Sequence, residues 1–311
     1  MTAKCIVRPI RTVVQIAHDL ELATDIFTNG IGFEIVGETV AKTEDVGELW
    51  GIRDAGFRVR RLARAGTEFG AVDLVESPRA ASPMRDPKRA YDRGLFSLNF
   101  RTGDLDGAMV RLAALGATAI SDPVGYDVRK PMREVLMDIG DGTRITLIQV
   151  GDTDVSAPLF GEPVATYGLI VPSVQSSLGF YRDALGLEVA IAFSHTGPPF
   201  DTALGIEGDL AMEFATLTAG GEWMAKLELL ELNVSGTAPE NRSELADFEH
   251  CGYAFLTWLT NEIGATRKIC VAAGADVIVE PKRFTRPFHE GSRAMIIRAP
   301  GGEYLEFIET Q

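Results

Sequence analysis

The stretch LGFYRDALGLEVA, residues 178–190, decides the fold because the chain contains a second version of it. ATDIFTNGIGFEIVG, residues 23–37, has Phe27 in the place of Tyr181 and Gly32 in the place of Gly186. These two pairs of residues each stand 154 positions apart. A near repeat at half the chain length indicates a duplicated unit.

Each copy lies in the same order of expected elements. An apolar strand, about residues 12–17 in the first copy, precedes a helix and a second strand. Asp19 and Ser173 are residue types that cap helix N-termini. Gly32 and Gly186 stand where a helix end requires left-handed backbone. The repeat is therefore a strand–helix–strand unit.

A second, more weakly related pair of units occupies residues 94–123 and 251–281. Each of the four units is followed by a further strand-like run, such as KLELLEL near Glu228 or YLEFIE near Glu306. We therefore expect an α+β fold of four βαβββ modules, at about residues 8–78, 94–150, 163–232 and 250–309. Sequence order pairs them into an N-terminal domain, 1–150, and a C-terminal domain, 163–311, joined by polar, proline-bearing segments.

The composition restricts the partners. A length of 311 residues suits two domains, and 46% hydrophobic residues without a membrane-length apolar run indicate a soluble protein. The net charge of −14 disfavours nucleic acid and anionic lipid. The N-terminus lacks the pattern of a signal peptide, and the spacing of the three cysteines does not indicate a disulfide framework. We therefore expect a cytoplasmic location. Glycine-rich phosphate loops are missing, so no nucleotide cofactor is expected.

The modules resemble the vicinal oxygen chelate superfamily, which includes glyoxalases, bleomycin resistance proteins and extradiol dioxygenases. The resemblance rests on LGFYRDALGLEV at 178–189, GDLDGAMVRLAALGA at 103–117 and RAPGGEYLEFIE at 298–309. It implies that each pair of modules forms a U-shaped mixed sheet around a cleft. It also implies a small-molecule substrate and allows one divalent metal, Fe, Mn, Zn or Ni, held by His, Glu or Gln of the first and last strands.

Spacing assigns the positions that would face each cleft. In the first half they are Thr12, Asp73, Ser97 and Thr146, and in the second half they are Thr166, Glu228, Gly252 and Glu306. The first set has one carboxylate, which makes the N-terminal domain the expected scaffold and the C-terminal domain the expected active one.

A metal site can be completed in the second set by a histidine. His250 stands two residues before Gly252, so His250, Glu228 and Glu306 form a candidate ligand set for the metal. Two simpler alternatives stay open. His250 is a half-exposed loop residue in one, and Glu228 pairs with Lys226 in solvent in the other.

Other residues are candidates for catalysis and binding. Glu306 is a candidate general base, and His289 and His195 lie in Gly, Pro and Phe-rich loop contexts of the kind that carry function. The expected substrate-binding residues are Arg286, Arg293, Thr166 and Tyr253. The arginines favour an anionic substrate, whereas the alternative is a solvated basic loop.

Two functions follow from the resemblance. The first is a lyase, isomerase or dioxygenase-like enzyme that acts on an anionic, aromatic or oxygenated metabolite in the C-terminal cleft. The second is a non-catalytic binding or resistance protein, because resistance proteins of the family also lack metal ligands. A homo-oligomer is compatible with both.

Overall fold

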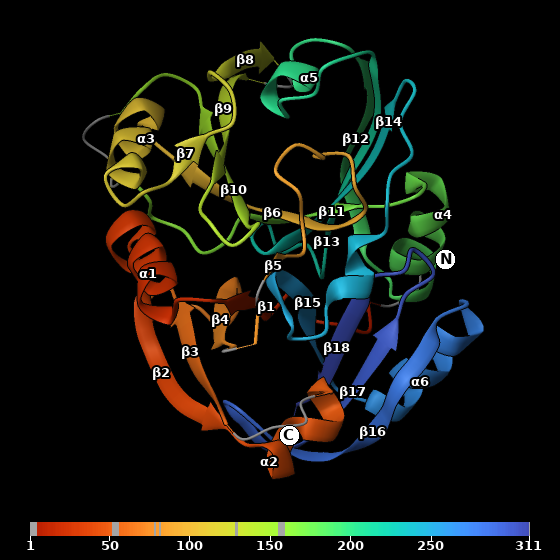
Figure 1. The fold of residues 1–311 in the computed structure, drawn as a ribbon. Coiled ribbons are helices and arrows are strands. Elements are labelled where there is room, and N and C mark those ends of the chain that lie inside the picture. Colours follow the sequence, from red (N-terminus) through yellow and green to blue (C-terminus); the bar gives the residue numbers. More distant parts are fainter. Residues whose placement is uncertain are drawn as a thin grey trace.

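The computed structural model describes residues 5–51, 56–77, 79–80, 82–127, 130–154 and 159–310. Residues 1–4, 52–55, 78, 81 and 128–129 of the expected first domain, 155–158 of the expected linker and 311 lie outside the described residues. Figure 1 shows two strongly curved sheets, one above the other, with most of the helices on their outer sides.

The four expected modules are present as folded units. Module one contains β1 (Thr12–Ala17), α1 (Leu20–Asp25), β2 (Glu34–Ala41), α2 (Thr43–Trp50), β3 (Phe57–Ala63) and β4 (Ala71–Glu76). Module two, after the short β5 (Ser82–Pro83), contains β6 (Gly94–Thr102), α3 (Leu105–Ala113), β7 (Thr118–Ala119), β8 (Val124–Asp127), β9 (Pro131–Asp138) and β10 (Arg144–Val150).

The second half repeats this order. Module three contains β11 (Thr166–Ile170), α4 (Val174–Leu178), β12 (Glu188–Thr196), α5 (Phe200–Ala203), β13 (Leu210–Thr218) and β14 (Lys226–Val234). Module four, after a 3-10 turn (Arg242–Leu245), contains β15 (His250–Thr260), α6 (Ile263–Ala272), β16 (Asp276–Arg286), β17 (His289–Arg298) and β18 (Tyr304–Glu309).

The predicted helix signals act as expected. Asp19 accepts hydrogen bonds from the backbone N–H groups of Glu21 and Leu22, both at 3.0 Å, and Ser173 caps α4 in the same way. Gly32 and Gly186 have φ of 82° and 80°, the left-handed region. The sequence did not predict that both helices widen into π-helical segments, Ile26–Ile31 and Gly179–Ala184.

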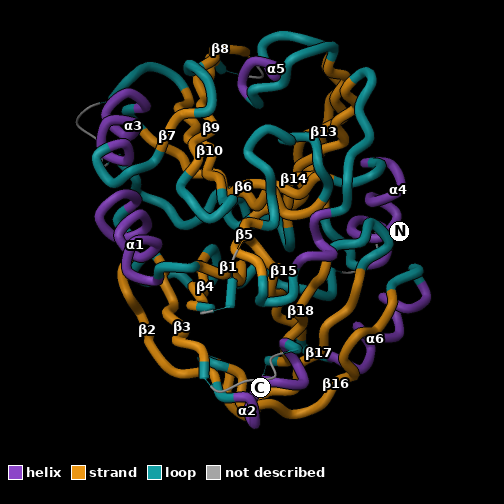
Figure 2. The backbone as a smooth tube through the Cα atoms, in the orientation of Figure 1, coloured by secondary structure: helices purple, strands orange, loops and turns teal. Residues whose placement is uncertain are grey.

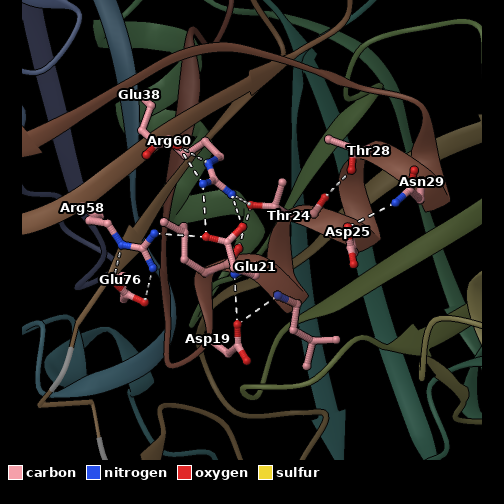
Figure 3. Close-up of polar contacts among 12 residues, drawn as sticks. Asp19, Glu21, Thr24, Asp25, Thr28, Asn29, Glu38, Arg58, Arg60 and Glu76 are labelled. Atoms are coloured by element: carbon pink, nitrogen blue, oxygen red, sulfur yellow. Dashed lines mark hydrogen bonds and ion pairs between the residues drawn. The ribbon is translucent and has the colours of Figure 1, made fainter.

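Ion pairs attach the first helix to its sheet. Figure 3 shows Asp19 at the start of α1 and, beside it, Glu21 between Arg58 and Arg60 of β3. The carboxylate of Glu21 lies 3.0 Å from Arg58 Nη1 and 2.9 Å from Arg60 Nη1. The first turn of α1 is thereby held against β3.

The modules pair differently from the expectation based on sequence order. Within the described residues, one sheet has the order β16-β17-β18-β15-β1-β4-β3-β2 and joins modules one and four. The other has the order β12-β13-β14-β11-β6-β10-β9-β7 and joins modules two and three. We call the sheet of modules one and four the outer-module sheet and that of modules two and three the inner-module sheet. Figure 2 shows their strands, in orange, as two separate groups. The expected domains 1–150 and 163–311 therefore do not correspond to the two sheets.

The pairing of first strands explains this arrangement. β1 lies antiparallel to β15, and β11 lies antiparallel to β6, so each sheet is continuous across a pair of first strands. Every module offers such a strand edge, and the repeats identify the modules without specifying which two edges meet.

The core fills both faces of the outer-module sheet. The largest apolar cluster lies between the helices and the convex faces of both sheets and includes Phe27, Phe100, Phe180 and Leu185. A second cluster, which includes Trp50 of α2, fills the concave face of the outer-module sheet. The concave face of the inner-module sheet has a smaller cluster and encloses a pocket. No helix in the described part of the chain has the length and apolar character needed to cross a membrane.

Candidate functional site

The four inner strands of each sheet place one set of equivalent side chains on the concave face. In the outer-module sheet, Thr12 and Glu306 both pair with Thr257, and Asp73 lies two residues beyond the partner of Thr12. In the inner-module sheet the same registers give Thr166, Thr146, Asn99 and Glu228. Asp73 and Glu228 are therefore structural equivalents.

Two of the eight predicted positions are not the ones that pair with the first-strand threonines. Asn99 of β6 pairs with Thr166, although Ser97 also lines the inner-module pocket, and Thr257 of β15, not Gly252, pairs with Thr12. Register irregularities in the pairs β1–β15 and β11–β6 shift the alignment that simple spacing from the helix caps predicts. The eleven-residue β15 adds to the error at Gly252.

An ion-pair network closes the cleft of the outer-module sheet. The guanidinium of Arg286 lies 2.9 Å from Asp73 Oδ2 and 2.9 Å from Glu306 Oε2. Arg61 Nε lies 2.7 Å from Asp73 Oδ1. Trp50 Nε1 donates to Glu306 at 3.1 Å, and the Arg286 guanidinium lies 5.1 Å from the Trp50 ring centroid. Glu306, the candidate general base, is completely buried, and Arg286, Trp50 and Thr257 already bond its two oxygens.

The charges of this network control its titrating groups. Burial alone would raise the pKa of Asp73, but Arg61 and Arg286 more than offset burial and hold the pKa of that carboxyl well below its usual range. Burial, and then the charges of Arg286 and Arg61, lower the pKa of His289 to about 2. His289 is therefore neutral near pH 7 and accepts a hydrogen bond from Arg61 at 3.3 Å.

The predicted metal ligands do not meet. Glu228 lies in the inner-module sheet and Glu306 in the outer-module sheet. His250 begins β15 and bonds Asp247 Oδ1 at 2.8 Å. Among the described residues no three His, Cys, Asp or Glu side chains form a group that could hold a metal ion.

Neither cleft fits the divalent metal that the family resemblance allows. Guanidinium groups already neutralise Asp73 and Glu306 in the outer-module cleft. The inner-module cleft offers the carboxylates of Glu228 and Glu134, an amide and two hydroxyls, but no histidine or cysteine is among its described lining residues, so it lacks a third strong ligand for Fe, Mn, Zn or Ni.

The remaining predicted site residues are dispersed. His195, on β12, bonds the carbonyl of Pro198 at 2.7 Å and packs edge-on against Phe200; it does not line the inner-module pocket but an adjoining hollow that shares Phe200 with it. Arg293 is half-exposed, 3.5 Å from Glu309. Tyr253 is buried in the core, where its hydroxyl donates to the carbonyl of Arg144, so it does not contact a substrate. Thr166 lines the pocket.

The pocket lies inside the U of the inner-module sheet and has a volume of about 170 Å³. Alternate residues of β14 show how the strand builds it. Leu227 and Leu229 enter the main core, whereas Lys226, Glu228 and Leu230 line the pocket. Most of the wall is apolar or aromatic, with contributions from Phe96, Tyr126, Met132, Leu136, Ile148, Phe193, Phe200, Met212, Phe214 and Leu230.

Glu228 is the carboxylate at the equivalent position in this pocket. The Asn99 Nδ2 atom donates to both of its oxygens, at 3.2 and 3.1 Å. The side chain is enclosed by protein yet remains partly accessible from the pocket. Burial, and secondarily the neighbouring Glu134, raise the pKa of Glu228 to about 7. Such a group exchanges protons near neutral pH.

A second carboxylate lines the same pocket. Glu134 of β9 accepts a hydrogen bond of 2.6 Å from the Tyr126 hydroxyl of β8, and burial raises the pKa of Glu134. Sequence reasoning missed Glu134, Tyr126 and Asn99. The alternation Met132, Glu134, Leu136 in β9 is the signal that could have placed Glu134 on the pocket face.

Two U-shaped mixed sheets, each made from two βαβββ modules, define a class of α+β proteins, the glyoxalase-like proteins. The family model described as Glyoxalase/Bleomycin resistance protein/Dioxygenase superfamily matches residues 164–307. This match covers somewhat less than half of the chain, and it confirms the resemblance noted in the sequence. The matched residues are modules three and four, which lie in different sheets.

Solved structures share the whole architecture. Glyoxalase I from Zea mays is similar with a TM-score of 0.68 and 17% identity, over 97% of this chain and 92% of that one. A mutant of the same maize enzyme gives 0.70, with the same identity and the same coverage. A putative dioxygenase from Bacillus subtilis gives 0.63 and 14% identity, over 99% of this chain and 86% of that one. No curated protein matches significantly by sequence.

Proposed function

We propose that this protein is a small-molecule enzyme of the vicinal oxygen chelate type whose active site is the pocket of the inner-module sheet. The observation that carries the proposal is the position of Glu228. It occupies a position equivalent to Asp73, opens into a pocket, and forms no ion pair among the described residues. The proposed reaction is a proton transfer, as in an isomerase or a lyase.

The surroundings of Glu228 suit this chemistry. With a pKa of about 7, the carboxyl group is present in both protonation states near neutral pH, so it can accept a proton and return it. The Asn99 amide binds both carboxylate oxygens and orients the group. The apolar wall excludes water from the ligand and keeps a bound substrate in place.

Glu228→Gln tests this proposal. The substitution retains the size and one of the two oxygens that accept from Asn99 but removes the titrating group, so we expect a loss of about 100-fold or more in turnover. Incubation of the enzyme with a metabolite mixture, followed by mass spectrometry, identifies the compound consumed and the product formed. Glu213→Gln is the matched control, because Glu213 lies on β13 of the same sheet and is exposed outside the pocket. Equal turnover by both variants would contradict the proposal.

The alternative function is a non-catalytic binding protein. The mostly apolar pocket wall and the weak metal-ligand set favour it. It predicts that a ligand is retained unchanged and that Glu228→Gln affects only affinity. A cytoplasmic location and a homo-oligomeric state are further predictions that apply to both functions.

A further inference from the structure

The two clefts provide an internal comparison for the charge of the ligand. In the outer-module cleft, Asp73 is neutralised by two guanidinium groups, those of Arg61 and Arg286. Arg286 also lies against the Trp50 ring. In the inner-module cleft, the equivalent Glu228 contacts the neutral Asn99 amide. No ion pair in the described ranges joins Glu228 to a cation.

The cations that line the inner-module pocket are engaged elsewhere. Lys226 Nζ donates to the Trp223 carbonyl at 2.7 Å and lies 5.0 Å from the centroid of the Trp223 ring. Arg101 lies 3.8 Å from Glu162. The second carboxylate of the pocket, Glu134, is bonded to the neutral Tyr126 hydroxyl. Two carboxylates thus face the same pocket, and neither forms an ion pair within 4 Å in the described part of the chain, although the charge of Lys226 acts on Glu228 from a distance.

Aromatic rings line the same pocket as these carboxylates. Phe200 packs against Tyr126 at 4.9 Å and against Phe193 at 5.9 Å, and Phe193 stacks on Phe214 at 4.6 Å. Carboxylates together with aromatic faces recognise organic cations, by charge-assisted hydrogen bonds and by cation–π contact. The outer-module cleft shows the same combination, with Arg286 as the cation.

We infer that the pocket binds an organic cation, a protonated amine or a guanidinium carried on a small aromatic body, with the cation directed at Glu228 and Glu134. The ligand supplies the charge that Arg286 supplies in the outer-module cleft. This inference rests on the proposed use of the pocket for a small molecule. The size is set by the volume of about 170 Å³, since a cavity of about 150 Å³ holds benzene. An organic cation replaces the anionic substrate that the sequence predicted. The arginines behind that prediction do not serve the pocket, because Arg286 is bonded internally and Arg293 lies outside it.

Three probes of nearly equal size separate charge from shape. Benzylamine, benzyl alcohol and benzoate are titrated into the full-length protein at pH 8, and their dissociation constants are measured by calorimetry. Benzylamine is expected to bind about tenfold tighter than benzyl alcohol, and benzoate is expected to bind most weakly. Equal or tighter binding of either other probe, or no measurable binding of benzylamine, overturns the inference.

Substitutions locate the effect. Glu228→Gln is expected to weaken benzylamine about tenfold and to change benzyl alcohol by less than about twofold. Glu134→Gln provides a second variant with the same expected direction, so a folding defect in one does not decide the result. Glu213→Gln is expected to bind both probes as the parent protein does. Parent-like benzylamine affinity in both pocket variants contradicts the inference.

The outcomes also separate this inference from the proposed function. If a neutral substrate is turned over and Glu228→Gln abolishes its turnover, the enzyme proposal stands and the cation inference fails. If benzylamine binds in a Glu228-dependent manner and no metabolite is converted, the cation inference stands and the binding-protein alternative replaces the enzyme.

Discussion

Asp73 and Glu228 occupy equivalent positions in the two sheets but differ in the pKa of their carboxyl groups. Both are carboxylates on a last strand, two residues beyond the partner of a first-strand threonine. The guanidiniums beside Asp73 hold its pKa low despite burial, whereas burial, and then the nearby Glu134, raise the pKa of Glu228 to about 7 because no cation is paired with it among the described residues. The side chains from neighbouring strands, and not the carboxylate itself, decide which of the two is suited to proton transfer.

The raised pKa of Glu228 predicts a pH-dependent stability. Below pH 4.5 the group is protonated in the folded and the unfolded chain. As the pH rises from 4.5 to about 7, the unfolded chain ionises first, so this contribution to stability is lost, up to about 3 kcal/mol. Urea unfolding of the parent protein and Glu228→Gln between pH 5 and pH 8 measures it. We expect the parent protein to lose stability relative to the variant as the pH rises; a constant difference would contradict the assignment.

At the scale of elements, local signals placed helices and strands well. Asp19, Asp104 and Ser173 all cap helices through side-chain hydrogen bonds to backbone N–H groups, as their sequence contexts indicate. The strand KLELLEL is β14. These features depend on residues within a few positions of each other, which is why the sequence predicts them.

Two glycines of the fold-deciding stretch give a matched test. Gly186 has φ of 80°, so Gly186→Ala forces a side chain into left-handed backbone and is expected to destabilise by about 1–2 kcal/mol. Gly179 has φ of −58°, and an added Cβ at that position meets nothing within 4 Å. Gly179→Ala is expected to stabilise by about 0.5–1 kcal/mol. Denaturant midpoints measure both; effects of the same sign would refute this account of Gly186.

At the scale of the whole molecule, the order of modules in the chain differs from their order in space. Modules one and four, at the two ends of the chain, form one sheet, and modules two and three form the other. Neither half of the chain contains a complete U-shaped sheet. The structure therefore does not divide into an N-terminal scaffold and a C-terminal active domain. It has one cleft that is filled by the Arg286 ion pairs and one cleft that holds a pocket, and each is built from both halves of the chain.

This pairing predicts that the halves depend on each other. Residues 1–154 and 159–311 expressed separately should lack cooperative unfolding as monomers, because each would expose the unpaired edges of its two first strands. Mixed together, they should associate and recover a single transition. Calorimetry and size-exclusion chromatography of each half and of the mixture measure this. A half that unfolds cooperatively as a monomer would show that the sheets in solution follow sequence order.

The candidate site was predictable only in part. The carboxylate Glu228 and the wall residue Thr166 follow from the spacing within their own modules. Asn99, Glu134 and Tyr126 come from module two and reach Glu228 through sheet pairing between modules. The metal set of His250, Glu228 and Glu306 failed for the same reason, because it assumed that modules three and four share a cleft.

The sequence by itself determined the four modules, their helix caps and left-handed glycines, and the resemblance to the superfamily, because these depend on local backbone preferences and on repetition. Only the tertiary structure decided which modules share a sheet, and therefore which side chains surround each carboxylate. Strand edges of similar modules are interchangeable locally, and their choice of partner is made by packing over the whole chain. That choice gives Asp73 two arginines and leaves Glu228 facing an open pocket.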